Sequence, residues 1–310
     1  METNEMNTAP ASAPIPVKKM GKFRASYLLT VEGFELIKKD KHIFLFPLLS
    51  LLANLTFLVI FFVGYFLITG SFDPEKAERT SDFGYYGYII TFFFYLIGAF
   101  ILAFFDAGLT LVVDARINGR SMTFEEGMDG AKAHIQKIFI WSLVSATVGI
   151  ILKIISDKSK WVGKLVAALL HASWGIVTFF IVPALMLEEG KVSDAIKSSA
   201  NTFKKTWGET IIINFSTGLF LGVLTLLTII VFAIGIFVVA PFVPAVLVIP
   251  ALILVAVLIG LFLLGLGIFS HAVDSVLRVV LFEYSKTGRL PDSFAPELIL
   301  GMLKKQEAGK

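Results

Sequence analysis

One carboxylate stands inside an apolar stretch, where ionisable side chains are rare. Asp106 occurs in the run Ala-Phe-Phe-Asp-Ala-Gly, within a stretch long enough to cross a bilayer. An unpaired carboxylate at the bilayer centre costs at least about 2.5 kcal/mol, so Asp106 is expected to face protein or water, to be protonated, or to have a partner. A carboxylate in this position can join helices by hydrogen bonds, or it can form part of a proton or substrate pathway.

Three other polar side chains are candidate companions of Asp106. Asn54, His171 and Asn214 fall in the first, fourth and fifth apolar stretches of the chain. With Asp106 they form a candidate intramembrane polar cluster that could line one polar core. We favour a structural role for this cluster, hydrogen bonding between helices, over a role in transport.

The sequence offers little else that could carry chemistry. Cysteine is absent, which excludes disulfides, thiolate metal sites and cysteine nucleophiles. The four histidines, His42, His134, His171 and His271, are scattered without metal-ligand spacing. No phosphate-binding glycine loop and no nucleophile–base arrangement is visible. We therefore expect no enzyme activity, no cofactor and no metal site.

The elements that would position these residues are six long apolar stretches. Hydrophobic residues make up 56% of the chain and charged residues only 16%, with a mean hydropathy of +0.82. Each stretch approaches or exceeds the roughly 20 residues that a helix needs to span a bilayer. They cover about 43–69, 86–113, 138–156, 162–187, 211–239 and 243–270. The predicted fold is all-α, a polytopic membrane protein with six transmembrane helices in three hairpins.

The remaining sequence divides the chain into three parts. Residues 1–20 are rich in proline and small polar residues and are expected to form a disordered tail. Residues 21–290 form the predicted membrane domain, and 291–310 form a short cytoplasmic tail. No cleavable signal peptide is expected, because the first apolar run begins at Ile43 and is too long.

The distribution of lysine and arginine predicts the orientation. Of these residues, 21 flank one side of the six spans and 6 flank the other. The positive-inside rule then places both termini in the cytoplasm, with the protein in the cytoplasmic (inner) membrane of a prokaryote.

One loop departs from this pattern. Lys153, Lys158, Lys160 and Lys164 lie between the third and fourth spans, on the predicted outer side. The third and fourth spans could therefore be shallow or re-entrant. We favour the other explanation, in which Lys153 and Lys164 lie near helix ends and extend to the interface.

Cytoplasmic segments before each hairpin carry apolar residues at helical spacing. Such a stripe predicts an amphipathic helix before each pair of spans, although juxtamembrane helices can also be amphipathic by accident. The stripes are Phe23, Tyr27, Val31, Phe34 and Ile37, then Phe124, Met128, Ala131, Ile135 and Ile138, then Val192, Ile196, Ala200, Phe203 and Trp207. Thr123 is the expected N-cap of the second helix, after a helix-terminating Gly119.

Three stretches, 38–50, 141–149 and 204–209, carry a resemblance to a known family. They read KKDKHIFLFPLLS, WSLVSATVG and KKTWGE. In these stretches the chain resembles a family of uncharacterised prokaryotic six-helix integral-membrane proteins, a domain of unknown function. The resemblance implies distant kinship to the membrane domain fused to glycerophosphodiester phosphodiesterases. It brings no activity and no catalytic residues, and the phosphodiesterase domain itself is missing, so no hydrolase function is expected.

Two classes of function stay open. The favoured one is a non-enzymatic membrane module that organises lipid or an envelope complex, with the bilayer, anionic headgroups or another envelope protein as partner. The second is a small transporter or permease with a polar midplane site around Asp106. An intramembrane enzyme comes third. Nucleic acid is not an expected partner, because the formal charge is only +3 and topology explains the lysines.

Overall fold

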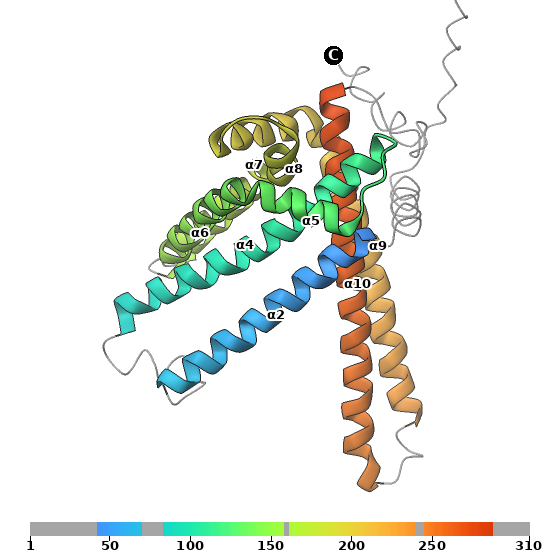
Figure 1. Ribbon diagram of the computed structural model, residues 1–310. Coiled ribbons are helices and arrows are strands. Elements are labelled where there is room, and N and C mark those ends of the chain that lie inside the picture. The colour runs from blue at the N-terminus through green and yellow to red at the C-terminus, as the bar shows by residue number, and fades with distance from the viewer. Residues whose placement is uncertain (1–41, 70–82, 158–160, 240–244, 288–310) are drawn as a thin grey trace, which may run out of the picture.

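The computed structural model describes residues 42–69, 83–157, 161–239 and 245–287, and every regular element in these ranges is an α-helix (Figure 1). The helices are α2 (His42–Thr69), α4 (Phe83–Ile117), α5 (Phe124–Ala133), α6 (Ile135–Asp157), α7 (Trp161–Val177), α8 (Ile181–Leu187), α9 (Val192–Val239) and α10 (Ala245–Thr287). The predicted all-α class is confirmed for this part of the chain. Both predicted tails and the first amphipathic helix lie outside the described residues.

Five segments of the described chain are long and apolar enough to cross a membrane. They are His42–Leu67, Gly87–Ile117, Ile135–Asp157, Gly163–Leu187 and Ile249–Thr287. These segments indicate a multi-pass membrane protein. The predicted fifth span, 211–239, falls within α9, where the described apolar part is the shorter segment Gly222–Phe232. The described residues therefore contain five candidate spans, compared with the six that the sequence predicts.

The buried core lies at one end of the helices. It combines the start of α2, the second half of α4, α5, the start of α6, α8, the start of α9 and the end of α10. Phe46, Phe180 and Phe282 are among its largest fully buried side chains. We call this region the packed end. The helix ends in this region are those next to the basic segments of the predicted cytoplasmic side.

Away from the packed end the helices diverge. Figure 1 shows the lower halves of α9 and α10 running as a pair away from α2 and α4. Helices α6 and α7 lie on the side of α4 that is opposite α2. In the most apolar window of α10 no residue is buried. Large apolar side chains such as Leu67, Ile249 and Leu261 are more than half exposed. Only lipid or another apolar partner can solvate such a surface.

A tight turn and two glycines bring α5 against α4. Gly119 has a φ of 71°, which follows the end of α4 and suits glycine because it has no Cβ. Thr123 then caps α5 in a reciprocal capping box with Glu126, as predicted for the N-cap. A Cβ on Gly127 would lie 3.0 Å from the carbonyl oxygen of Gly108 and 2.9 Å from Cζ of Phe46, so the helices can cross this closely only without it.

The predicted fourth span is interrupted near its end. The chain makes a turn over residues 178–180 before α8 begins at Ile181. Pro183 accounts for the break, because its ring clashes with the carbonyl four residues earlier and it lacks an N–H donor. The backbone N–H of Phe180, freed by the turn, donates instead to the hydroxyl of Ser199 at 3.0 Å. This bond ties the break to the start of α9 within the packed end.

Helix α9 consists of two helical segments that meet at a kink. Thr206 has φ −111° and ψ 17° inside the helix, close to the boundary expected between an amphipathic helix and the fifth span. Its hydroxyl donates to the carbonyl of Thr202 at 2.8 Å, a bond that often accompanies helix bending. Before the kink, the buried positions are Val192, Ala195, Ser199, Thr202 and Thr206. Ile196 and Phe203 of the predicted stripe pack at the edge of the core.

Candidate functional site

The carboxylate of Asp106 is paired with an imidazole from the other end of the chain. Asp106 lies on α4, and His271 lies on α10. The distance from Nε2 of His271 to Oδ1 of Asp106 is 2.9 Å. The Asp106 side chain is 11% exposed and that of His271 is 31% exposed. Because an unpaired carboxylate is costly to bury in a membrane, we expect Asp106 to have a partner, and His271 is that partner.

Small residues flank the pair on both helices. Ala107 follows Asp106, Ala272 follows His271, and both are fully buried. Ala103, one turn before Asp106, is also buried. Small side chains allow membrane helices to approach closely, which brings short polar groups within hydrogen-bonding distance. The pair therefore sits where α4 and α10 contact each other, at the border of the packed end.

A cavity of about 480 Å³ adjoins this pair between α2, α4 and α10. His271 lines it, together with Ser50 and Asn54 of α2, and the other lining residues are apolar or glycine. We call it the inter-hairpin cavity. The amide nitrogen of Asn54 donates to the carbonyl of Ser50 at 3.0 Å, so this side chain bonds mainly within its own helix. Asn54 and Asp106 thus lie near the same cavity, on different helices.

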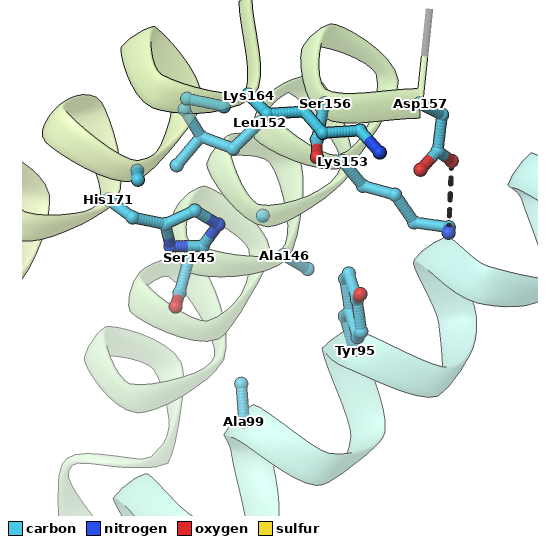
Figure 2. A pocket seen from close by; sticks show the side chains of 13 residues that line it. Tyr95, Ala99, Ser145, Ala146, Leu152, Lys153, Ser156, Asp157, Lys164 and His171 are labelled. Atoms are coloured by element: carbon cyan, nitrogen blue, oxygen red, sulfur yellow. Dashed lines mark ion pairs between the residues drawn. The ribbon is translucent and has the colours of Figure 1, made fainter. Parts of the chain in front are cut away.

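The predicted companion His171 lies elsewhere. It lines a second pocket, of about 600 Å³, between α4, α6 and α7. Figure 2 shows His171 and Lys164 of α7 around this space, with Lys153 and Asp157 of α6 and Tyr95 of α4. We call it the lysine pocket. Nζ of Lys153 and Oδ2 of Asp157 form an ion pair at 3.0 Å along its rim.

The fourth member of the predicted cluster, Asn214, falls on α9. Its side chain lies outside the described residues, so its distance to the Asp106–His271 pair is not defined. The histidine of the pair, His271, was not among the predicted companions. It is the first residue after the predicted end of the last span, at 270, whereas α10 continues to Thr287. The signal in the sequence was a histidine at the cytoplasmic edge of an apolar stretch.

The pair can exchange a proton and can join two helices. An imidazole protonated at Nε2 donates to the carboxylate, and a doubly protonated imidazole makes the pair ionic. Among the residues that the structure describes, no group of three or more His, Cys, Asp or Glu side chains could hold a metal ion. The geometry of the site is that of a helix-joining hydrogen bond beside a small cavity.

These features indicate an α-helical, multi-pass membrane protein with a carboxylate–imidazole pair between α4 and α10. A family model described as "Family of unknown function (DUF6159)" matches residues 85–291, about two thirds of the chain. The chain belongs to this family. No curated protein and no solved structure matches it. The family places the chain among proteins without an assigned activity, in agreement with the uncharacterised family that the sequence resembles.

Proposed function

We propose that this chain is a non-enzymatic membrane module that organises either lipid or an envelope complex. The observation that carries the proposal is the divergence of the hairpins from a single packed end (Figure 1). The most apolar window of α10 has no buried residue. Lipid tails are as apolar as the side chains they meet, so helices in a bilayer have no hydrophobic drive to close such gaps. The module would hold lipid between its hairpins.

The proposed topology has six spans, the five candidate segments and the predicted fifth span along α9. Helix α9 ends at Val239, α10 begins at Ala245, and the two helices pack against each other. A helix that turns back within so few residues and packs along a spanning helix has to traverse the same layer. The described apolar segment Gly222–Phe232 supports this position for the fifth span.

The proposed orientation puts the packed end at the cytoplasmic face of a prokaryotic inner membrane. Its support is the 21 to 6 division of basic residues, which favours the side on which α5 and the start of α9 lie. Lysines and arginines near an anionic leaflet contribute about 1 kcal/mol each to its attraction. Kinship to the membrane domain fused to glycerophosphodiester phosphodiesterases is part of the proposal only as a likeness of membrane architecture, without hydrolase activity.

Single cysteines test the orientation, because the chain has none of its own. We expect Ser81→Cys to react with an impermeant maleimide added outside intact cells, and Ser121→Cys to stay unlabelled. The reverse pattern would invert the proposed orientation. Protection of Ser159→Cys from the external reagent would instead favour a shallow position for α6 and α7.

The lipid-organising role is tested by counting boundary lipids. The purified chain is reconstituted into vesicles that contain spin-labelled phospholipid, and the motionally restricted fraction is measured by electron paramagnetic resonance. Diverging hairpins have a larger perimeter than a closed bundle, so we expect more restricted lipids per chain than for a compact six-helix membrane protein under the same conditions. An equal number would contradict the proposal.

A small transporter or permease is the second candidate function. The observation that favours it is the Asp106–His271 pair beside the inter-hairpin cavity, since ionisable pairs at membrane depth often mark proton pathways. The same vesicles, loaded with a pH-sensitive dye, test this role. We would assign the chain as a transporter if the parent chain gave proton flux and a folded Asp106→Asn variant gave none. That result would contradict the proposed module.

A further inference from the structure

The lysine pocket has the polarity of an amphiphile. Its charged residues, Lys153, Asp157 and Lys164, lie towards the ends of α6 and α7 that join the two helices. Ser145 and His171 line its inner part, where small side chains such as Ala146 leave room. A charged rim above an apolar wall with a few inner polar groups matches a headgroup above the first part of an acyl chain.

The depth of the pocket corresponds to about one leaflet. Ser145 and Asp157 are separated by twelve positions on α6, which corresponds to about 18 Å along a helix. Half of a typical hydrocarbon core is roughly 15 Å thick. The pocket therefore runs from the interface at the free end of α6 towards the bilayer centre, on the side away from the packed end.

Two serines that line this pocket lack the side-chain hydrogen bonds that other hydroxyl groups on α6 and α7 make. Elsewhere on α6 and α7, the hydroxyls of Ser142, Thr147 and Ser173 donate to the carbonyl four residues earlier, at 2.7–2.8 Å. Ser145 and Ser156, which line the pocket, make no side-chain hydrogen bond within the described part of the chain.

Two nitrogen-bearing side chains of the pocket also lack a partner within the described residues. Within the described ranges, neither Lys164 nor His171 has a hydrogen bond or an ion pair to another residue. Figure 2 shows both side chains at the pocket. Both side chains are exposed, whereas Ser145 and Ser156 are half-buried. Lipid tails cannot hydrogen-bond polar groups at membrane depth, so a cluster of unpartnered ones around one cavity points to a ligand that supplies acceptors.

The charge of the rim selects an anion. Two ammonium groups, Lys153 and Lys164, and one carboxylate, Asp157, leave a net formal charge of one positive. Lys153 is already paired with Asp157 at 3.0 Å, so of the two lysines that line the described pocket Lys164 is the one without an ion pair. A phosphodiester carries a single negative charge and several acceptor oxygens, which matches this rim better than a doubly charged phosphomonoester.

We infer that the lysine pocket binds the phosphodiester headgroup of an anionic phospholipid, with Lys164 as its main cationic contact. Ser156 and Lys153 complete the rim, and Ser145 and His171 meet the glycerol and ester oxygens below. The inference deepens the proposed lipid-organising function and rests on it. Under the proposed orientation the lipid belongs to the outer leaflet.

Native mass spectrometry of the full chain, released from micelles, tests this site. The probes are phosphatidylglycerol, phosphatidylcholine and glycerophosphoglycerol, a water-soluble phosphodiester. We expect one phosphatidylglycerol to be retained per chain, in preference to phosphatidylcholine, and glycerophosphoglycerol not to displace it. Displacement by glycerophosphoglycerol at equal concentration would assign the pocket to a soluble phosphate ester and overturn the lipid assignment.

Matched variants locate the binding. Lys164→Gln should weaken phosphatidylglycerol retention about tenfold, the effect of one charge-assisted hydrogen bond. Lys197→Gln removes an exposed charge on α9 and should leave it unchanged. Ala168→Phe, which fills the pocket, should abolish retention, whereas Val166→Phe, at a position of α7 that does not line the pocket, should not. Equal effects within either matched pair would overturn the site.

The outcomes separate this site from the proposed function. A chain that retains no phosphatidylglycerol but has the enlarged boundary-lipid count would overturn the lysine pocket as a binding site and leave the lipid-organising module in place. A chain that retains one phosphatidylglycerol through Lys164, with a boundary-lipid count of a compact bundle, would leave the site in place and contradict the proposed module.

Discussion

Oδ1 of Asp106 and Nε2 of His271 lie 2.9 Å apart although 165 positions separate the two residues in the sequence. The bond joins the second half of α4 to α10, and so it holds these two helices together. Hydrogen bonds between membrane helices contribute about 0.6 kcal/mol on average and up to about 1.7 kcal/mol. The pair is therefore a modest but specific link between α4 and α10.

We expect Asp106→Asn to fold as well as the parent chain, because the amide oxygen still accepts a hydrogen bond from the imidazole. Asp106→Leu should destabilise the fold by leaving His271 unpaired. A double-mutant cycle with His271→Leu, measured by unfolding in denaturing detergent, should give a coupling energy of about 0.6–1.7 kcal/mol. Strictly additive effects of Asp106→Leu and His271→Leu would show that the pair does not join the helices.

Gly127→Ala should destabilise the packed end by about 1–3 kcal/mol, the usual cost of overpacking. Its new Cβ would lie 2.6 Å from Cγ2 of Val112 and 3.0 Å from the carbonyl oxygen of Gly108. The control is Gly64→Ala on α2, where nothing lies within 4 Å of a new Cβ. That change should be neutral or slightly stabilising, because alanine favours a helix. If both variants have the same thermal stability, α4 and α5 do not cross as closely as described.

The capping box at the start of α5 makes its stability depend on pH. The backbone N–H of Thr123 donates to Oε2 of Glu126 at 2.7 Å, and the Thr123 hydroxyl donates at 3.1 Å. These bonds lower the pKa of Glu126 below its ordinary value of 4.5. The ionised carboxylate of Glu126 therefore stabilises the folded state above about pH 4.5. This stabilisation is lost as the pH falls through the pKa that Glu126 has in the folded state.

A carboxyl-carbon NMR titration of the chain in micelles measures this pKa, with Glu126→Gln as the assignment control. Thr123→Ala should raise the pKa of Glu126 towards 4.5 and cost about 1 kcal/mol through loss of the N-cap. An unchanged pKa in Thr123→Ala would mean that the hydroxyl does not bond to the carboxylate in solution.

Phe203→Asp should lower the amount of folded protein in the membrane. Phe203 packs against the core, with its ring centroid 6.0 Å from that of Phe179. Lys197→Asp, on the exposed face of the same helix, should change stability by no more than about 0.5 kcal/mol. The comparison is made by fluorescence-detected size exclusion of the two variants. Equal losses would mean that Phe203 does not face the packed end.

Local features of the structure could be predicted because local chemistry determines them. Hydropathy located the apolar stretches, and Thr123 after Gly119 predicted the N-cap of α5 that the structure contains. These signals depend on residues within one or two turns of each other. The end of the last helix was predicted less well, because α10 stays helical to Thr287 after its apolar character ends near residue 270.

The pairing of Asp106 could not be predicted in the same way. His171 and His271 both stand at apolar stretches, and the choice between them depends on which helix packs against α4 at that level. Helix α10 does so beside Asp106, whereas His171 lines the pocket on the side of α6 and α7. Helix-to-helix contacts in a bilayer depend on packing over the whole surface of each helix, which a single sequence pattern does not encode.

Separation of the hairpins in a bilayer is the central claim, and a distance between two spin labels tests it most directly. Leu67→Cys on α2 and Ile249→Cys on α10 put labels at exposed positions far from the packed end. Phe62→Cys with Phe93→Cys is the control pair, because Phe61 and Phe94 pack at 4.8 Å within the first hairpin. In lipid nanodiscs we expect a short distance for the control pair and, for the Leu67–Ile249 pair, a distance far beyond the about 8–10 Å between the axes of packed helices. A Leu67–Ile249 distance as short as that of the control pair would show that the hairpins close in the bilayer and would contradict the account.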